Sequence, residues 1–421
     1  MSFNIALSGL QATTQDLNTI SNNIANASTN GFRGGRSEFA SIYNGGQAGG
    51  VGVMSTTQNF SQGGSLTYTG RQLDMGIQGE GFFVLKGSDG GAMYARAGMF
   101  HKDSEGFITD PVGSRLQGYS VNATGQLQAG NVGDLQVQTG SLPAKSTTKV
   151  GLVSNLDARV EPIAVAFDPK DINTYHSIGT SSVYDSLGAE HVVTQYYVKT
   201  AANEWTVNYT LDGALVTLPP LPPVTIPPTP PTLLTTKLKF DTNGVLVPPP
   251  APPAPPGTNA TKQSLDLTLS NGATNLKFDI DFDKSTQYAA KYNNSSLSQD
   301  GYTSGELKGV RLDDNGMLYG TYTNGQDQLQ GQVVLANFSN PNGLSAVSNN
   351  AWVATNTAGQ AITGAPATGT MGTVTGGYLE GSNVDTTAEM VNLMTAQRNY
   401  QSNAKVLDVN STMQQALLNA I

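Results

Sequence analysis

The C-terminal segment at 382–421 constrains the fold most, because its apolar residues recur at the spacing of a helix that packs against another helix. Thr386 and Glu389 have the spacing of a capping box, which predicts that the helix begins there, and no proline or glycine follows. Apolar residues then recur at intervals of seven at Leu393, Tyr400, Leu407 and Ile421, with a polar residue, Gln414, at the one remaining position. Two further apolar residues, Ala404 and Leu418, fall at the step between these positions. This seam predicts a partner helix.

The N-terminus carries the only comparable seam. A helix is predicted from about 4 to 27, ending near Gly31, where glycine can adopt the left-handed C′ position. Its apolar positions are Phe3, Ala6, Leu10, Leu17, Ile20, Ile24 and Ala27. The two helices either pack on one globular core or form a coiled-coil-like pair that also packs against neighbouring subunits. Because both seams are thin and isolated helices are marginal in water, we expect the pair to gain order on assembly.

Between the two ends, short apolar runs alternate with Asp-Gly and Asn-Gly turns, which predicts a mixed, mainly β fold with antiparallel domains. Two of these strands are predicted at 81–85 and 164–167. If the two end helices pair, the chain must pass through each domain between them twice, once on the way out from the first helix and once on the way back to the last. The domains are therefore nested. The predicted plan has paired helices at 1–31 and 378–421, extended connectors at 32–70 and 355–377, a discontinuous inner β domain at 71–148 and 289–354, and an outer β domain at 149–288.

A proline-rich stretch at 219–256 interrupts the outer block and holds 15 of the 21 prolines. Proline removes donors from a strand ladder, so this stretch is interpreted as an exposed loop or polyproline II arm rather than a core strand. A ligand for a proline-binding module is one alternative. A rigid surface insertion is the favoured interpretation.

The acidic character of the chain limits its partners. The formal net charge is −9, and only 13% of the residues are charged. Such a surface disfavours nucleic acid and anionic membranes. Cysteine is absent, no Lys or Arg precedes Arg33, and no apolar run approaches roughly 18 residues. We therefore expect no cleavable secretory signal, no membrane insertion, and a chain suited to an oxidising space that it reaches by another export route.

The sequence lacks motifs of catalytic, metal or cofactor sites. It has no Cys nucleophile, and its three histidines lack metal-ligand spacing. An Asp-x-Asp-x-Asp run at 279–283 lacks the Gly and Glu of a calcium loop and alternates with apolar residues, as a strand does. The two carboxylates of a glycosidase meet only in three dimensions, so that alternative stays open. We predict no enzyme activity and no cofactor.

Three groups of residues form recognisable motifs. The first is Ile-Ser-Asn-Asn-Ile-Ala-Asn followed by Thr-Asn-Gly-Phe, the second is Gly-x-Gly-Phe-Phe-Val, and the third is Leu-Glu-x-Ser-Asn-Val-Asp followed by Ala-Gln-Arg-Asn-Tyr-Gln. Their motif residues are Asn22, Asn23, Asn26, Gly31, Phe32, Gly81, Phe82, Asn383, Asp385, Gln397 and Arg398. Together these motifs resemble the signatures of the flagellar rod and hook protein family, and they frame the chain from residue 5 to 421.

The resemblance implies a structural polymer. The length of the chain and its middle block favour the hook members of the family, whose subunits form a curved flexible tube that joins the rod to the filament as a universal joint and transmits motor torque. It also implies further copies of the chain in a helical tube, the rod, hook cap and hook–filament junction proteins, and the flagellar type III export apparatus as partners. The implied location is the extracellular hook.

Two alternatives stay open at this stage. One is a distal rod subunit; the other, from a different class, is a secreted β-rich binding protein or carbohydrate-active enzyme. On the hook interpretation, the apolar residues of both helices form the core contacts between subunits. These residues are Phe3, Leu10, Leu17, Ile20, Ile24, Leu393, Tyr400, Leu407, Leu418 and Ile421.

Overall fold

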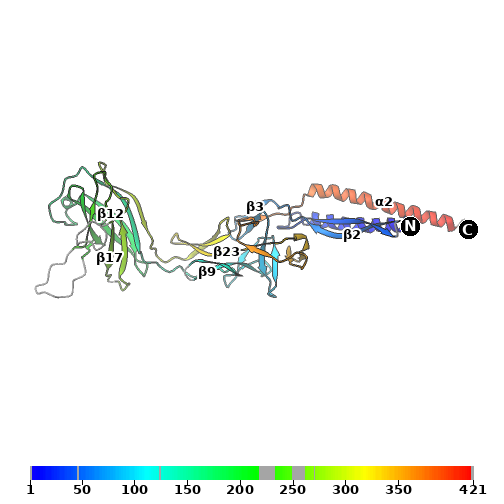
Figure 1. Ribbon diagram of the computed structural model, residues 1–421. Coiled ribbons are helices and arrows are strands. Elements are labelled where there is room, and N and C mark those ends of the chain that lie inside the picture. Colours follow the sequence, from blue (N-terminus) through cyan, green and yellow to red (C-terminus); the bar gives the residue numbers. More distant parts are fainter. Residues whose placement is uncertain are drawn as a thin grey trace. The chain divides into compact units, whose positions relative to one another are not determined.

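The computed structural model describes residues 2–44, 47–122, 125–217, 233–248, 261–269 and 271–418. The chain divides into two compact units (Figure 1). The predicted fold class is confirmed, since the chain is mainly β and the helices at its two ends pack against each other. Unit 1 comprises Met1–Thr139, Leu307–Tyr322 and Gln326–Ile421, and unit 2 comprises Gly140–Glu306 and Thr323–Gly325.

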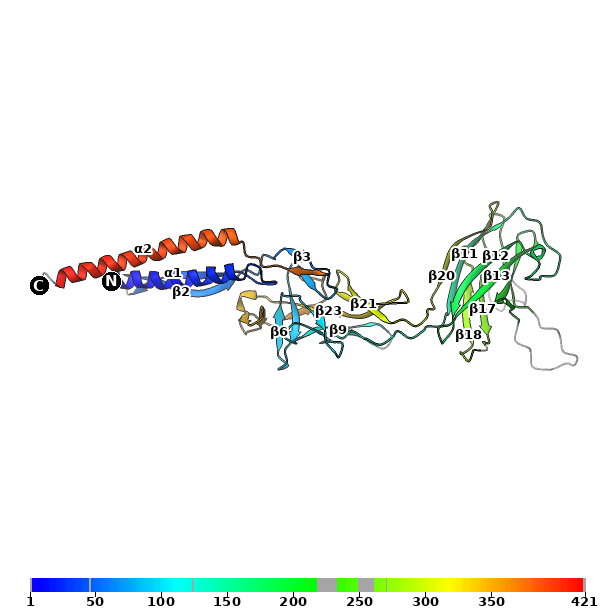
Figure 2. The same ribbon diagram turned by 180° about the vertical axis from the view of Figure 1, so that it is seen from behind.

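The two terminal helices of unit 1 lie side by side. Helices α1 (Ser2–Ala25) and α2 (Thr386–Leu418) run in opposite directions, and the C-terminal end of α2 extends past the first residues of α1 (Figures 1 and 2). The predicted end of α1 is too late. Gly31 is left-handed, with a φ of 72°, but turns at 26–30 separate it from the helix, so it is not the C′ residue.

A β-hairpin runs along α1 where the sequence predicts an extended connector. Strands β1 (Gly35–Asn44) and β2 (Gln47–Gln58) are antiparallel. The Oγ1 of Thr19 lies 2.9 Å from Oγ of Ser37, so a hydroxyl pair joins the helix to β1. A Cβ added to Gly50 would lie only 2.1 Å from Oγ of Ser8, so the glycine at this position allows β2 to approach α1 closely. The first connector is therefore largely an ordered part of the helix layer.

The β part of unit 1 is built around a sheet with the strand order β21-β22-β23-β9-β5-β6-β26-β25. Residues from both of its chain segments meet in one core, which includes the fully buried Phe83, Leu116 and Leu335. The strands of this sheet and its branches are β5 (Phe82–Lys86), β6 (Ala92–Ala95), β7 (His101–Lys102), β8 (Ile108–Thr109), β9 (Arg115–Val121), β10 (Leu127–Asp134), β21 (Leu307–Leu312), β22 (Met317–Tyr322), β23 (Asp327–Val333), β24 (Leu335–Asn337), β25 (Ser345–Val347), β26 (Ala351–Val353) and β27 (Ile362–Gly364). Strands β4 (Met75–Gln78) and β28 (Thr373–Gly376) pair with each other in a separate antiparallel ladder. A separate short ladder pairs β3 (Leu66–Tyr68) with β29 (Tyr378–Glu380) ahead of α2.

Unit 2 contains two sheets that enclose a core with Trp205, Tyr209 and Phe282 fully buried. One sheet has the order β12-β13-β14-β15 with β16 on β14, and the other has β17-β18-β11-β19 with β20 on β11. The strands are β11 (Lys149–Asp157), β12 (Ser177–Tyr184), β13 (Glu190–Ala201), β14 (Glu204–Leu211), β15 (Ala214–Leu215), β16 (Thr235–Lys239), β17 (Lys262–Leu267), β18 (Leu276–Asp281), β19 (Thr286–Tyr288) and β20 (Asn293–Gln299). The second sheet is not purely antiparallel as predicted, because β11 runs parallel to β18 and β19.

Two local predictions in unit 2 are wrong. Within the proline-rich stretch, residues 233–248 include β16, which pairs with β14 and buries Leu238 and Phe240 in the core. This segment has no proline before Pro248 and alternates buried with exposed residues, as a strand requires. The rest of the stretch lies outside the described residues. The predicted strand at 164–167 is irregular, since Pro162 and Pro169 flank it and remove ladder donors.

One histidine of unit 2 lies between two carboxylates. The Nδ1 of His191 is 2.7 Å from Oδ2 of Asp212, and its Nε2 is 3.4 Å from Oδ2 of the fully buried Asp185. Burial opposes the charge on His191, but the hydrogen bonds to both carboxylates outweigh it and raise its pKa above 6.5. The same hydrogen bonds help to lower the pKa of Asp185 and of Asp212, although burial opposes them there too.

These pKa shifts predict a pH-dependent stability of unit 2. A group with a raised folded pKa contributes stability that is fully present below its unfolded pKa, and this is lost as the pH rises through the folded pKa. The urea concentration at the unfolding midpoint of unit 2 should therefore decline as the pH rises above about 6.5, and His191→Asn should flatten that decline. His101→Gln in unit 1 is the control, and an unchanged decline in the His191 variant would refute this assignment.

Candidate assembly site at the paired termini

The first turn of α2 is capped by Asp385, not by Thr386 as the capping-box prediction had it. Oδ1 of Asp385 accepts hydrogen bonds from the backbone N–H of Thr387 at 2.8 Å and of Ala388 at 3.2 Å. Glu389, assigned to the reciprocal bond of the box, instead accepts from Nδ2 of Asn23 on α1 at 3.3 Å. The cap therefore lies one residue earlier, and Glu389 joins the two helices.

The contact between the helices is made by small and polar side chains. Nδ2 of Asn403 on α2 donates to Oγ1 of Thr13 on α1 at 3.4 Å, and a Cβ on Gly9 would lie 3.0 Å from the same amide nitrogen. Ala396, in the first half of α2, is buried, and so is Ala12 on α1. The helices thus approach closely at positions where a large side chain would separate them.

The predicted seam residues take different positions. Ile20 is buried; Leu10, Leu17, Ile24, Leu393 and Leu407 are half-buried; and Phe3 and Tyr400 are exposed by 42% and 39%. The side chain of Leu418 and the whole of Ile421 lie outside the described residues. In the single chain, the larger apolar residues therefore cover the contact only in part.

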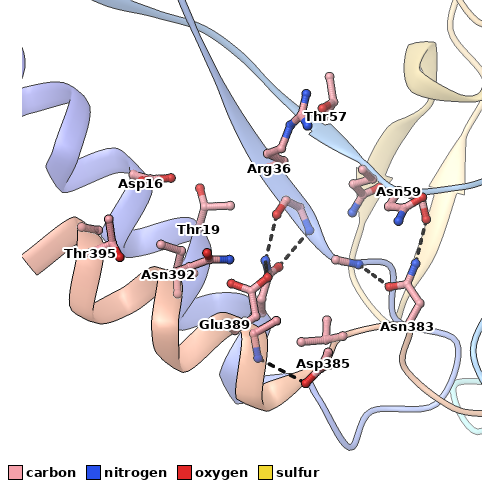
Figure 3. A pocket seen from close by; sticks show the side chains of 18 of the residues that line it. Asp16, Thr19, Arg36, Thr57, Asn59, Asn383, Asp385, Glu389, Asn392 and Thr395 are labelled. Carbon is pink, nitrogen blue, oxygen red and sulfur yellow. Dashed lines mark hydrogen bonds between the residues drawn. The ribbon is translucent and has the colours of Figure 1, made fainter. Parts of the chain in front are cut away.

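Two motif asparagines fasten the chain at the base of the helices, where a polar recess opens between α1, α2 and the start of the hairpin (Figure 3). Asn23 exchanges two hydrogen bonds of 2.8 Å with the backbone N–H and C=O of Gly35. Oδ1 of Asn383 accepts from the N–H of Gly34 at 2.8 Å, and its Nδ2 donates to the carbonyls of Asn59 and Gln62. Each side-chain amide thus makes the hydrogen bonds that these backbone groups would otherwise make with a neighbouring strand.

The recess itself is lined by side chains from α1, α2 and both hairpin strands, including Asp16, Glu389 and Arg36 (Figure 3). Burial raises the pKa of Asp16. Among the described residues, no group of three His, Cys, Asp or Glu side chains could hold a metal ion. The recess is a junction between α1, α2 and the hairpin strands β1 and β2.

A buried ion cluster lies next to this junction. Oε1 of Glu380 accepts from Nη2 of Arg33 at 2.7 Å and from the N–H of Gly64 at 3.0 Å, while its Oε2 accepts from Nη1 of Arg96 at 3.2 Å. The side chains of Arg33, Glu380 and Arg96 are exposed by only 0%, 1% and 3%. Burial lowers the pKa of Arg96 to about 10, against the opposing effect of Glu380, so Arg96 stays charged at neutral pH. Glu380 belongs to one of the sequence motifs, but the sequence predicted no contact among these three residues.

The remaining motif residues divide into two groups. Asn26 donates to the backbone and side-chain oxygens of Asn22 at 2.9 Å, and Phe32 and Phe82 are buried. The ring of Phe82 lies 5.6 Å from that of Trp352 and beneath the Arg96 guanidinium, while Gly81 is left-handed with a φ of 117°. Gln397 and Arg398 differ, because their side chains are exposed on α2.

Known sequence families match the chain in consecutive segments. Residues 3–33 match "Flagella basal body rod protein", and residues 76–152 match "Flagellar hook protein FlgE/F/G D1 domain". Residues 155–302 match "Flagellar basal body protein FlaE D2 domain", and residues 375–420 match "Flagellar basal body rod FlgEFG protein C-terminal". The paired helices and both β regions thus each have a counterpart in flagellar proteins.

The flagellar hook protein FlgE of Salmonella typhimurium is 38% identical over 426 residues, and the match covers 100% of both chains. The chain belongs to the flagellar hook protein family. The hook protein of Escherichia coli K12 is 37% identical with the same coverage, and that of Rhizobium meliloti is 32% identical over 98% of this chain and 97% of the relative. The crystal structure of Helicobacter pylori flagellar hook protein FlgE2 shares the fold, with a TM-score of 0.54 at 13% identity, over 75% of this chain and 100% of that chain.

Membership resolves the alternatives that the sequence left open. The chain is a structural component of the flagellar hook rather than an enzyme, and neither a distal rod subunit nor a secreted binding protein. As a hook protein it functions as part of a polymeric assembly. No helix in the described part of the chain is long and apolar enough to cross a membrane.

The junction predicts that Gly31 is indispensable for stability. Its φ of 72° disfavours any side chain, and a Cβ there would lie 2.4 Å from the backbone nitrogen of Ala97. Gly31→Ala should therefore lower the free energy of unfolding of unit 1 by at least about 2 kcal/mol, measured by urea denaturation. Gly90→Ala is the matched control, because Gly90 is also left-handed, with a φ of 83°, but has no atom within 4 Å of its Cβ position. Equal losses for the two variants would contradict the close fit at Gly31.

Proposed function

We propose that this hook protein assembles into a curved, flexible tube of many copies that links the rod to the filament and transmits motor torque. On this proposal, residues 1–31 and 378–421 form the inner layer of the tube, and the β regions form the layers outside it. A tube of identical subunits needs heterologous contacts that do not close into a ring. The residues proposed for these contacts are the apolar residues of the two predicted seams, one on α1 and one on α2, together with the exposed motif residues Gln397 and Arg398.

A second seam on α2 carries this proposal. Exposed residues recur at intervals of seven along the helix, at Ala388, Thr395, Ser402, Val409 and Ala416. Because Ala388 and Thr395 also line the recess beside α1, the part of this seam offered to a further helix is the C-terminal part around Val409. Val406 and Met413, exposed by 47% and 57%, fall at the intermediate step. This second seam is offset by two positions from the one through Leu393 and Leu407, which is about 200° around a helix. A helix with heptad seams on two sides suits a layer in which each helix packs against α1 and against a further helix.

The partners follow from the same proposal. The tube ends would contact rod proteins on one side and the junction proteins of the filament on the other, and a hook cap would cover the growing end. The subunit would leave the cell through the flagellar type III export apparatus.

Placing a charge on the second seam tests the proposal. Val409 is exposed by 53%, so Val409→Asp should leave the single chain folded while burying an unpaired carboxylate in the tube wall. We expect normal far-UV circular dichroism and no tubes by electron microscopy after salting out. Gln401→Asp places the same charge on the exposed face between the two seams and should still form tubes. Normal tubes from Val409→Asp would remove the second seam from the assembly contacts.

A further inference from the structure

The Arg33–Glu380–Arg96 cluster joins three segments that are far apart in the sequence. Arg33 lies between α1 and β1, Glu380 ends β29 shortly before α2, and Arg96 directly follows β6 of the inner sheet. One carboxylate therefore receives a guanidinium from the helix layer on one oxygen and a guanidinium from the β sheet on the other. The second arm of Arg96 also donates to the carbonyl of Gly79 at 2.8 Å, at the end of β4.

Backbone contacts around the cluster are equally close. The N–H of Gly31 donates to the carbonyl of Glu380 at 2.8 Å, and the N–H of Gly381 donates to that of Ser65 at 2.9 Å. A Cβ on Gly64 would lie 2.0 Å from the carbonyl oxygen of Gly381. The segment before α2 is thus held from two sides without space for further side chains.

The cluster is poorly suited to provide stability alone. Among the described residues, Nε and Nη1 of Arg33 and Nε of Arg96 have no hydrogen-bond partner, although all three are buried. Burying charged donors without acceptors is costly, and buried ion clusters are often no more stabilising than apolar side chains of the same volume. Each guanidinium does, however, donate a charge-assisted hydrogen bond to a different oxygen of one carboxylate, and this defines the position of each segment.

We propose that the Arg33–Glu380–Arg96 cluster is a coupling joint, which makes the helix pair and the inner β sheet open as one cooperative unit. Without it, the chain could open between Arg33 and β1 and between β29 and α2 while the sheet stayed folded. With it, a load on the helices passes to the sheet. The statement that the helices carry a load rests on the proposed function in the hook. The coupling between the helices and the sheet is a property of the single chain.

Hydrogen exchange of the full-length monomer in subdenaturing urea tests the joint. In the wild type, the amides of α1, α2, 26–34 and 378–389 should share one opening free energy with those of β5 and β9. Glu380→Gln removes the charge between the two guanidiniums, and breaking a buried ion pair is strongly destabilising. The helix and junction amides should then open on the order of a hundredfold more often, while β5 and β9 change by less than about threefold.

Two further variants make the result decisive. Asp327→Asn removes a carboxylate from the exposed ion pair with Arg311 in the same unit and should leave both sets of amides unchanged. If Glu380→Gln does not fold, Arg33→Lys keeps the charge but replaces the planar guanidinium that reaches Oε1 of Glu380, and it should give the same pattern more weakly. Equal acceleration throughout unit 1, or no acceleration in the helices, would overturn the joint. Either result would leave hook assembly intact, because Val409→Asp tests that separately.

Discussion

The carboxylate of Glu380 is the interaction on which the arrangement of unit 1 depends. It is buried between Arg33, which follows the first helix, and Arg96, which follows an inner strand, and it lies just before the last helix. Both ends of a chain of 421 residues are therefore brought to one point of the β sheet. The amide clamps of Asn23 and Asn383 then set the positions of α1 and α2 against the start of the hairpin.

The contact between the two helices beyond this junction contributes little stability of its own. It is made by alanines, hydroxyls and one amide, and several of the larger apolar residues of the helices stay exposed in the single chain. Such a pair stabilises itself weakly, because little apolar area is buried and isolated helices are marginal in water. This matches the needs of an assembling subunit: a firm base fixes the direction of the helices, while their free sides stay available for other copies.

The sequence predicted the elements whose signals are local. Heptad spacing predicted both terminal helices, and the strand predicted at 81–85 lies within one residue of β5. The Glu380 cluster was missed because its partners are separated by 347 and 284 positions, a distance at which no spacing rule operates. The strand β16 was missed because prolines on both sides concealed the short alternating run between them. The capping prediction failed by one residue, since aspartate and threonine both cap helices and only the structure shows which side chain turns back.

The pairing of α1 with α2 in the single chain is the central claim, and a disulfide tests it directly. The natural chain has no cysteine, and a Cβ on Gly9 would lie 3.1 Å from Cγ of Asn403, so cysteines at these two positions are within bonding reach. Mild oxidation of the dilute Gly9→Cys/Asn403→Cys monomer should close an intramolecular disulfide, detected by mass spectrometry as a loop joining the two terminal peptides. Free thiols after oxidation, or crosslinks only between different chains, would contradict the pairing.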